Sequence, residues 1–100
     1  MIQINGTVTT GDTFTEDTIT AIVRMMQASR AEDGCIDYTF ARDLADPAKL
    51  VVYERRRDHA ALEAHRNSAH MAEFRKFLAA NPPGTIELRL YETDEGEPLG

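Results

Sequence analysis

Apolar and polar residues alternate in four segments of the chain, a pattern typical of β-strands. The four segments are residues 1–9, 35–41, 50–56 and 86–91. The turn signal Asp46-Pro47 separates the second and third segments, so these two predict an antiparallel hairpin. The apolar side of the strands, which we expect to face the helices, carries Ile2, Ile4, Val8, Ile36, Tyr38, Phe40, Leu50, Val52, Ile86, Leu88 and Leu90.

A first helix is predicted between the first two strands. Its apolar residues follow the i, i+3, i+4, i+7 spacing of an amphipathic helix and are Ile19, Ile22, Val23 and Met26. Thr15 is the expected N-cap, because two acidic residues then lie in the first turn, where the helix dipole favours anions. Thr10-Gly11-Asp12 is a turn before the helix, and Gly34 is the expected stop.

A second helical region follows the third strand. Asp58 can cap it, and Ala61, Leu62 and His65 occupy neighbouring positions. We expect a break near Asn67, after which Ser68 caps a new helical segment. The apolar stripe of this segment is His70, Phe74, Phe77 and Leu78, and the helix ends at Asn81-Pro82-Pro83-Gly84.

The order βαββαβ predicts a ferredoxin-like α+β fold, a four-stranded antiparallel sheet with two helices on one face. One hundred residues with 42% hydrophobic content fit one domain over residues 1–92, followed by an acidic tail over 93–100. The other face of the sheet is half apolar and carries Asn5, Cys35, Thr39, Val51, Tyr53, Arg89 and Tyr91. No element is left to cover that face, so we expect a homodimer that packs sheet against sheet.

Charge and composition narrow the classes of partner. A net charge of −6 and a pI of about 4.9 argue against nucleic acid or an anionic membrane as a partner. No apolar run approaches the ~20 residues that span a bilayer, and the N-terminus lacks a signal-peptide pattern. Cys35 is the single cysteine, so no intrachain disulfide forms, and a cytoplasmic location is expected.

Glu54, His65 and His70 gather at one strand-to-helix junction, which makes it the candidate site. An imidazole, with an ordinary pKa of about 6.5, suits a general base near neutral pH. Each residue also has a structural interpretation. A histidine on an apolar face is commonly a core residue that donates to a strand carbonyl or to Glu54. Glu54 can simply pair with Arg56 or cap the helix, and Tyr38 can be a core aromatic.

Other chemistries find less support. His65 and His70 are five residues apart, a spacing that does not place two ligands on one helix face, so we predict no metal site. The expected break near Asn67 weakens this argument without removing it. No Gly-rich phosphate loop follows a strand, so no nucleotide or flavin cofactor is expected. His59 is expected in solvent, Ser68 has a capping role, and Arg55-Arg56-Arg57 is interpreted as a solvated cluster of ion pairs.

A set of motifs resembles the antibiotic biosynthesis monooxygenase domain family. The motifs, spread over residues 1–91, are Glu32-Asp33-Gly34-Cys35, Tyr38, Asp46-Pro47, Tyr53-Glu54, Asp58, Ala61-Leu62, His65, Ser68 and His70. The resemblance implies a dimeric ferredoxin-like protein, a dimeric α/β barrel. The family includes small quinol monooxygenases that use neither metal nor flavin, haem-degrading enzymes, and an isomerase that acts on a phosphorylated signal molecule.

This chain departs from the family pattern at one position. Family members commonly carry an aromatic residue, often Trp, two positions after the glutamate, where this chain has Arg56 and contains no Trp. The departure weighs against an aromatic polyketide as the substrate. The haem-degrading relatives use an Asn, Trp and His set. Asn5 matches the first member, but Arg75 stands at the position of the histidine.

The resemblance and the residues together lead to one main hypothesis. We expect a cofactor-independent monooxygenase that oxidises a small quinol-like or enolisable substrate with O2. His65 or His70 would be the base, and Tyr38, Glu54 and Arg56 would orient the substrate. One alternative is an isomerase or binding protein for a small, phosphorylated carbonyl compound, which a cation in the cleft would suit. Another is a non-catalytic dimeric module whose pocket is closed by core side chains.

Overall fold

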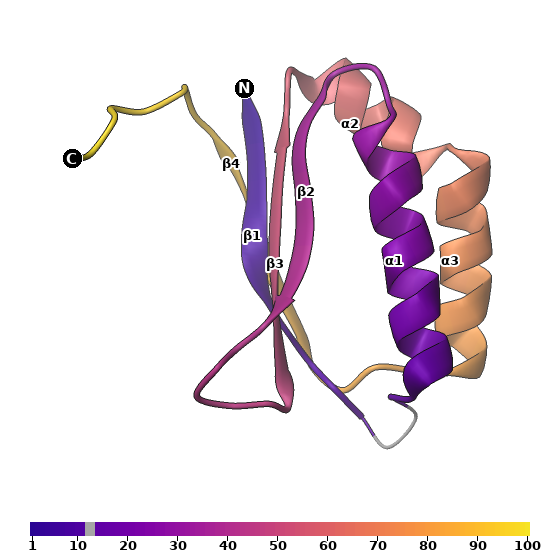
Figure 1. Cartoon of the computed structure of the whole chain (residues 1–100). Helices are drawn as coiled ribbons and strands as arrows, with labels where there is room; N and C mark the ends of the chain where they lie inside the picture. The colour runs from indigo at the N-terminus through magenta and orange to yellow at the C-terminus, as the bar shows by residue number, and fades with distance from the viewer. Residues whose placement is uncertain (12–13) are drawn as a thin grey trace.

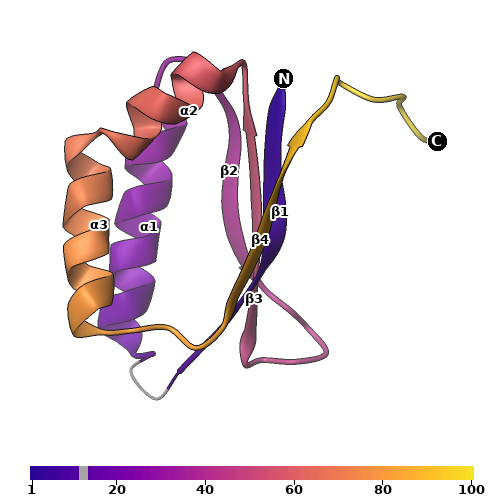
Figure 2. The ribbon, with the colours of Figure 1, turned by 180° about the vertical axis from the view of Figure 1, so that it is seen from behind.

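The computed structural model describes residues 1–11 and 14–100 and contains one four-stranded sheet with three helices on one of its faces (Figure 1). The elements are β1 (Ile2–Thr9), α1 (Glu16–Arg30), β2 (Cys35–Arg42), β3 (Lys49–Arg56), α2 (His59–Arg66), α3 (Ala69–Ala80) and β4 (Ile86–Glu92). Seen from behind, the helices again lie on one side of the sheet, and the C-terminal tail leaves on the other (Figure 2). The predicted turn Thr10-Gly11-Asp12 falls partly outside the described residues, because it includes Asp12.

The strand order β2-β3-β1-β4, with every neighbouring pair antiparallel, confirms the predicted ferredoxin-like fold. Across the sheet, Tyr38 pairs with Glu54, Glu54 with Ile4, and Ile4 with Leu90. Residues that pair directly share a face of the sheet, so Tyr38 and Glu54 both point toward the helices. In the described part of the chain, no helix has the length and apolar character needed to cross a bilayer.

The three predicted helix starts are confirmed by their local hydrogen bonds. The backbone N–H of Thr15 donates to Thr18 Oγ1 at 3.2 Å at the start of α1. Asp58 Oδ1 accepts from the Ala61 N–H at 2.9 Å at the start of α2. Ser68 Oγ accepts from the Met71 N–H at 3.2 Å, so the second helical region divides into α2 and α3 near Asn67, as predicted.

The buried face of α1 differs from the predicted one. Thr18, Ile22, Met25 and Ser29 are buried, whereas Ile19 and Val23 are exposed. The observed face also has helical spacing and shares Ile22 with the predicted stripe, but its centre is turned by roughly 80° from that stripe. The small side chains Thr18 and Ser29 allow close packing on this face, a contribution that a count of apolar residues does not register.

A β-bulge at the start of β2 reverses the predicted directions of two side chains. The register shifts between Cys35, which pairs with Arg56, and Asp37, which pairs with Arg55. Ile36 was expected in the core but is 45% exposed, and Cys35 was expected on the open face but packs against the core. The extra residue in the bulged strand interrupts the alternation of side chains between the two faces of the sheet. A prediction from strict alternation therefore placed both Cys35 and Ile36 on the wrong face.

Strand β4 has an apolar side but no cover. Ile86, Leu88 and Leu90 were expected to be covered by the helices, yet all residues of β4 are exposed. The core instead lies between the helices and strands β2 and β3, and its buried residues are Ile22, Met25, Tyr38, Leu50 and Phe74. Val51 and Tyr91 are also exposed, and the homodimer that was predicted to cover the open face stays a prediction.

Candidate functional site

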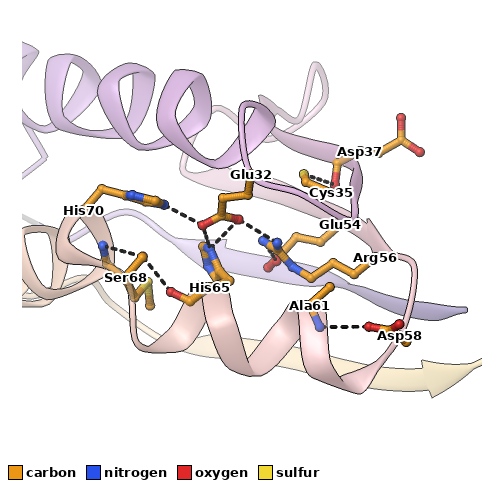
Figure 3. A network of polar contacts seen from close by, with 11 residues as sticks. Glu32, Cys35, Asp37, Glu54, Arg56, Asp58, Ala61, His65, Ser68 and His70 are labelled. Carbon is orange, nitrogen blue, oxygen red and sulfur yellow. Dashed lines mark hydrogen bonds and ion pairs between the residues drawn. The ribbon is translucent and has the colours of Figure 1, made fainter.

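Glu32 is the centre of a cluster of polar side chains on the side of the sheet that carries the helices (Figure 3). Its ionised carboxylate accepts from three side chains. His65 Nδ1 donates to Oε2 at 2.9 Å, His70 Nε2 donates to Oε2 at 2.6 Å, and Arg56 Nη1 donates to Oε1 at 2.7 Å. Because an ionised carboxylate only accepts, each of these nitrogens carries the proton. The cluster therefore fixes the Nδ1–H tautomer of a neutral His65.

The turn between α1 and β2 places Glu32 in this position. Helix α1 ends at Arg30, and Gly34 adopts a φ of 80°, a conformation that favours glycine and matches its predicted role as the stop. The Gly34 carbonyl accepts from the Arg57 N–H at 2.8 Å, which ties the turn to the end of β3. Ala61 lies so close to Gly34 that a side chain at position 34 would collide with it. Glu32 is therefore held against α2.

Arg56 links the two carboxylates of the site. Its side chain is 1% exposed, donates from Nη2 to Glu54 Oε1 at 3.2 Å, and lies over the Tyr38 ring at 5.6 Å from the ring centroid. Its Nε has no hydrogen-bond partner within residues 1–11 and 14–100. A solvated cluster of three arginines was predicted. Only Arg55 and Arg57 fit that description. Arg55 forms an ion pair with Asp37, and Arg57 forms ion pairs with Asp33 and Asp58.

The cluster shifts the pKa values of its members in opposite directions. Burial raises the pKa of Glu32, but the hydrogen bonds from His65 and Arg56 outweigh burial, so the pKa lies below its ordinary value. Burial lowers the pKa of His65, and the bond to Glu32 restores only part of the shift. Burial raises the pKa of Glu54 more than Arg56 lowers it. Burial also raises the pKa of Tyr38.

A cavity of about 210 Å³ lies between the sheet and the helices. Most of its wall is apolar and includes Phe40, Val52, Met71, Phe74 and Leu88. Three neighbouring polar side chains also line it, namely Tyr38, Glu54 and His65. Tyr38 pairs directly with Glu54 across β2 and β3, and the Tyr38 and His65 ring centroids are 5.5 Å apart. An apolar chamber with a few convergent polar groups is the usual form of a small-molecule site.

The structure thus brings together three of the five predicted site residues at the cavity. His70 does not line it and instead donates to Glu32, with 25% of its side chain exposed. Arg56 does not line it either, because its guanidinium is committed to Glu32 and Glu54. His59 is exposed as predicted and pairs with Glu92 at 2.7 Å, from Nε2 to Oε1.

Glu32 is the residue that the sequence did not single out for the site. It follows the helix in a turn, outside every apolar stripe, so periodicity gave no reason to select it. The one available signal was its place in the motif Glu32-Asp33-Gly34-Cys35, which the family resemblance includes. The predicted partner of His65 was Glu54 or a strand carbonyl, and its observed partner is Glu32.

The two histidines come together despite their spacing of five residues in the sequence. Helix α2 ends at Arg66 and α3 begins at Ala69, so the expected break lies between the two histidines and the chain changes direction there. His65 Nδ1, His70 Nε2 and a Glu32 carboxylate oxygen all lie within 4.8 Å of one another. The arrangement therefore offers three potential ligands to a metal ion, whereas the prediction was none.

Comparison of the sequence with family models identifies one family. The model of the antibiotic biosynthesis monooxygenase family matches residues 1–77 of the chain. A segment of 51 residues is 43% identical to Rv0793 of Mycobacterium tuberculosis, which bears a provisional monooxygenase name. That match covers 51% of this chain and 50% of Rv0793, so the chain spans about half the length of this curated relative.

Solved structures share the whole fold. A Deinococcus radiodurans protein, provisionally described as an antibiotic biosynthesis monooxygenase, superposes with a TM-score of 0.87 and 22% identity, covering 100% of this chain and 99% of the other. The structure of Rv0793 superposes with a TM-score of 0.82 and 21% identity, covering 95% of this chain and 96% of the other. The structure of PA3566 of Pseudomonas aeruginosa superposes with a TM-score of 0.80 and 26% identity, covering 92% of each chain. The sequence identities of the Deinococcus protein and of Rv0793 over the superposed structures are low, so these two superpositions show a shared fold alone.

Proposed function

Since the chain belongs to the antibiotic biosynthesis monooxygenase family, we propose that it is a cofactor-independent monooxygenase acting in the cavity beside His65. Its substrate would be a small quinol-like or enolisable compound, and O2 the second substrate. The observation that carries the proposal is the Glu32–His65 pair, because it leaves one imidazole nitrogen available at an apolar cavity.

His65 is the proposed base. Its Nδ1–H is committed to Glu32, and Nε2 has no hydrogen-bond partner within residues 1–11 and 14–100. The Nε2 lone pair is therefore available to accept a proton from an acidic hydroxyl group of a bound substrate. Glu32 then stabilises the imidazolium that forms, in the way that a buried carboxylate supports a catalytic histidine. His70 holds Glu32 from the solvent side.

Tyr38 is the proposed donor to the substrate anion, and Glu54 is proposed to orient the substrate. Burial keeps the Tyr38 phenol protonated by raising its pKa, so its hydroxyl can donate to a negatively charged oxygen. Glu54 is paired with Arg56 as a carboxylate and lines the cavity, so it can accept a hydrogen bond from a second hydroxyl group of the substrate. The substrate anion is electron-rich and itself supplies the electrons that reduce O2. One oxygen atom enters the product and the other leaves as water.

The size and lining of the cavity limit the substrate. An apolar cavity of about 150 Å³ is enough to bind benzene. The cavity of about 210 Å³ therefore suits one ring with small substituents, and its mainly apolar wall favours an uncharged molecule. A large aromatic polyketide would not fit without movement of the helices.

Neither alternative gains from the structure. A phosphorylated substrate needs a free cation, but Arg56 is paired with two carboxylates and does not line the cavity. A non-catalytic module was expected to have its pocket closed by core side chains, whereas a cavity lies beside His65.

Consumption of O2 tests the proposed reaction and its location. Substituted hydroquinones and 1,3-dicarbonyl compounds are offered to chelator-treated protein, and O2 uptake is followed with an oxygen electrode. Leu88→Trp should lower kcat/KM by at least about tenfold (about 1.4 kcal/mol), mainly through KM, because Leu88 lines the cavity from an exposed strand.

Leu90→Trp is the matched control for this experiment. Leu90 lies on the same exposed strand but does not line the cavity, so its variant should keep the wild-type kinetics. Equal kinetics for the two tryptophan variants would place the reaction elsewhere, and the absence of O2 uptake with every substrate class would overturn the monooxygenase proposal.

A further inference from the structure

We propose that Glu32, His65 and His70 form a binding site for a divalent transition-metal ion such as Zn²⁺. The ligand atoms are Glu32 Oε2, His65 Nδ1 and His70 Nε2, which converge from the α1–β2 turn, from α2 and from α3 (Figure 3). The existence of this site does not depend on the proposed oxidation, because it requires only the three ligands and not the cavity.

The distances between the ligand atoms suit a single ion. Nitrogen and carboxylate ligands lie about 2.0–2.2 Å from Zn²⁺, so two ligands at the tetrahedral angle that this ion prefers are ~3.4 Å apart. Glu32 Oε2 is 2.9 Å from His65 Nδ1 and 2.6 Å from His70 Nε2. An ion can therefore replace the two bridging protons if the first pair of atoms moves apart by about 0.5 Å and the second pair by about 0.8 Å.

The donor set selects the class of ion. Two imidazoles and one carboxylate are typical ligands of Zn²⁺ and other first-row transition ions, whereas Mg²⁺ and Ca²⁺ prefer oxygen ligands throughout. The site also has access from outside, since the His70 side chain is 25% exposed and the Glu32 side chain is 14% exposed.

The surroundings orient the carboxylate for such an ion. Arg56 Nη1 donates to Oε1 of Glu32, and the shorter contacts of both histidines are with Oε2, although His65 Nδ1 also lies 3.1 Å from Oε1. A second partner of this kind typically fixes the orientation of a metal ligand. Glu54 pairs with Arg56 on its other side, so the arginine charge is shared between two carboxylates and does not by itself exclude a cation.

Metal binding and base catalysis compete for His65. An ion on Nδ1 needs the lone pair of that nitrogen, so the proton of the neutral ring moves to Nε2. The Nε2–H form cannot accept a proton from a substrate. Occupancy by Zn²⁺ should therefore stop any reaction that uses His65 as the base.

Titration with Co²⁺ and Zn²⁺ tests the site directly. Chelator-treated protein is titrated with Co²⁺ while its visible absorption is followed, and Zn²⁺ binding is measured by calorimetry. We expect one equivalent of each ion to bind and Mg²⁺ not to compete. His70→Ala should weaken binding by at least about 10–100-fold, the loss that removal of an outer partner of a ligand already causes.

His59→Ala is the matched control, because it removes an exposed imidazole that lies outside the three-ligand site. This variant should bind Zn²⁺ as the wild type does, and Zn²⁺ should raise the melting temperature of both but not of His70→Ala. The proposal fails if His70→Ala binds as tightly as the wild type, or if His59→Ala loses the ion. Neither failure bears on O2 uptake, which is measured in the presence of chelator.

Discussion

His65→Ala should lower turnover by about 10²–10⁴-fold while the protein remains folded. The substitution removes the proposed base, and the cavity and its other polar groups stay in place. Oxygen uptake per folded molecule is the measurement, with circular dichroism and urea unfolding as the check on the fold. Added imidazole should restore part of the rate, because it can occupy the space left by the ring.

His59→Ala serves as the control for this prediction, since it also removes one imidazole but lies in an exposed pair with Glu92. It should keep the wild-type rate. A His65→Ala protein that is less stable yet equally active per folded molecule would show that His65 has an architectural role only, and the proposed base would have to be abandoned.

Arg56→Met should destabilise the protein by about 3–5 kcal/mol, as removal of one partner from a buried ion pair does. Arg56 is 1% exposed and is the cation for both Glu32 and Glu54, so its loss leaves two buried carboxylates without their partner. A small domain has roughly 5–15 kcal/mol of stability in total, so this loss removes a large share of it. Urea unfolding measures the change.

Two further variants show whether the buried charges are the cause. Arg57→Met removes an exposed arginine with two ion pairs and should cost only about 0–1 kcal/mol. Glu54→Gln in the Arg56→Met background should recover part of the loss, because it removes one unpaired charge. Equal stabilities for Arg56→Met and Arg57→Met would contradict the linking role of Arg56.

The sequence predicted the elements of the fold because their signals are local. Alternation identified the strands, and Thr15, Asp58 and Ser68 marked the helix starts through hydrogen bonds within four residues. The order of those elements, with the handedness of crossovers, then left few arrangements for the sheet. Gly34 was identified as the helix stop for a similar local reason, its tolerance of positive φ.

The features that the sequence did not predict depend on tertiary contacts. The bulge at Ile36 follows from the pairing of β2 with β3, and the buried face of α1 follows from how closely the helix packs. Glu32 belongs to the site because its turn is tied to β3 and faces α2. Burial of Arg56 reflects two carboxylates from different parts of the chain, which no window of adjacent residues brings together.

The tautomer of His65 tests the central claim most directly. Nitrogen NMR of ¹⁵N-labelled protein at neutral pH, with chelator present, distinguishes a protonated from an unprotonated ring nitrogen. The Glu32–His65 pair predicts a neutral ring with the proton on Nδ1 and an unprotonated Nε2 at the cavity. A proton on Nε2, or on both nitrogens, would contradict the claim that this imidazole can accept a proton from a substrate at the cavity.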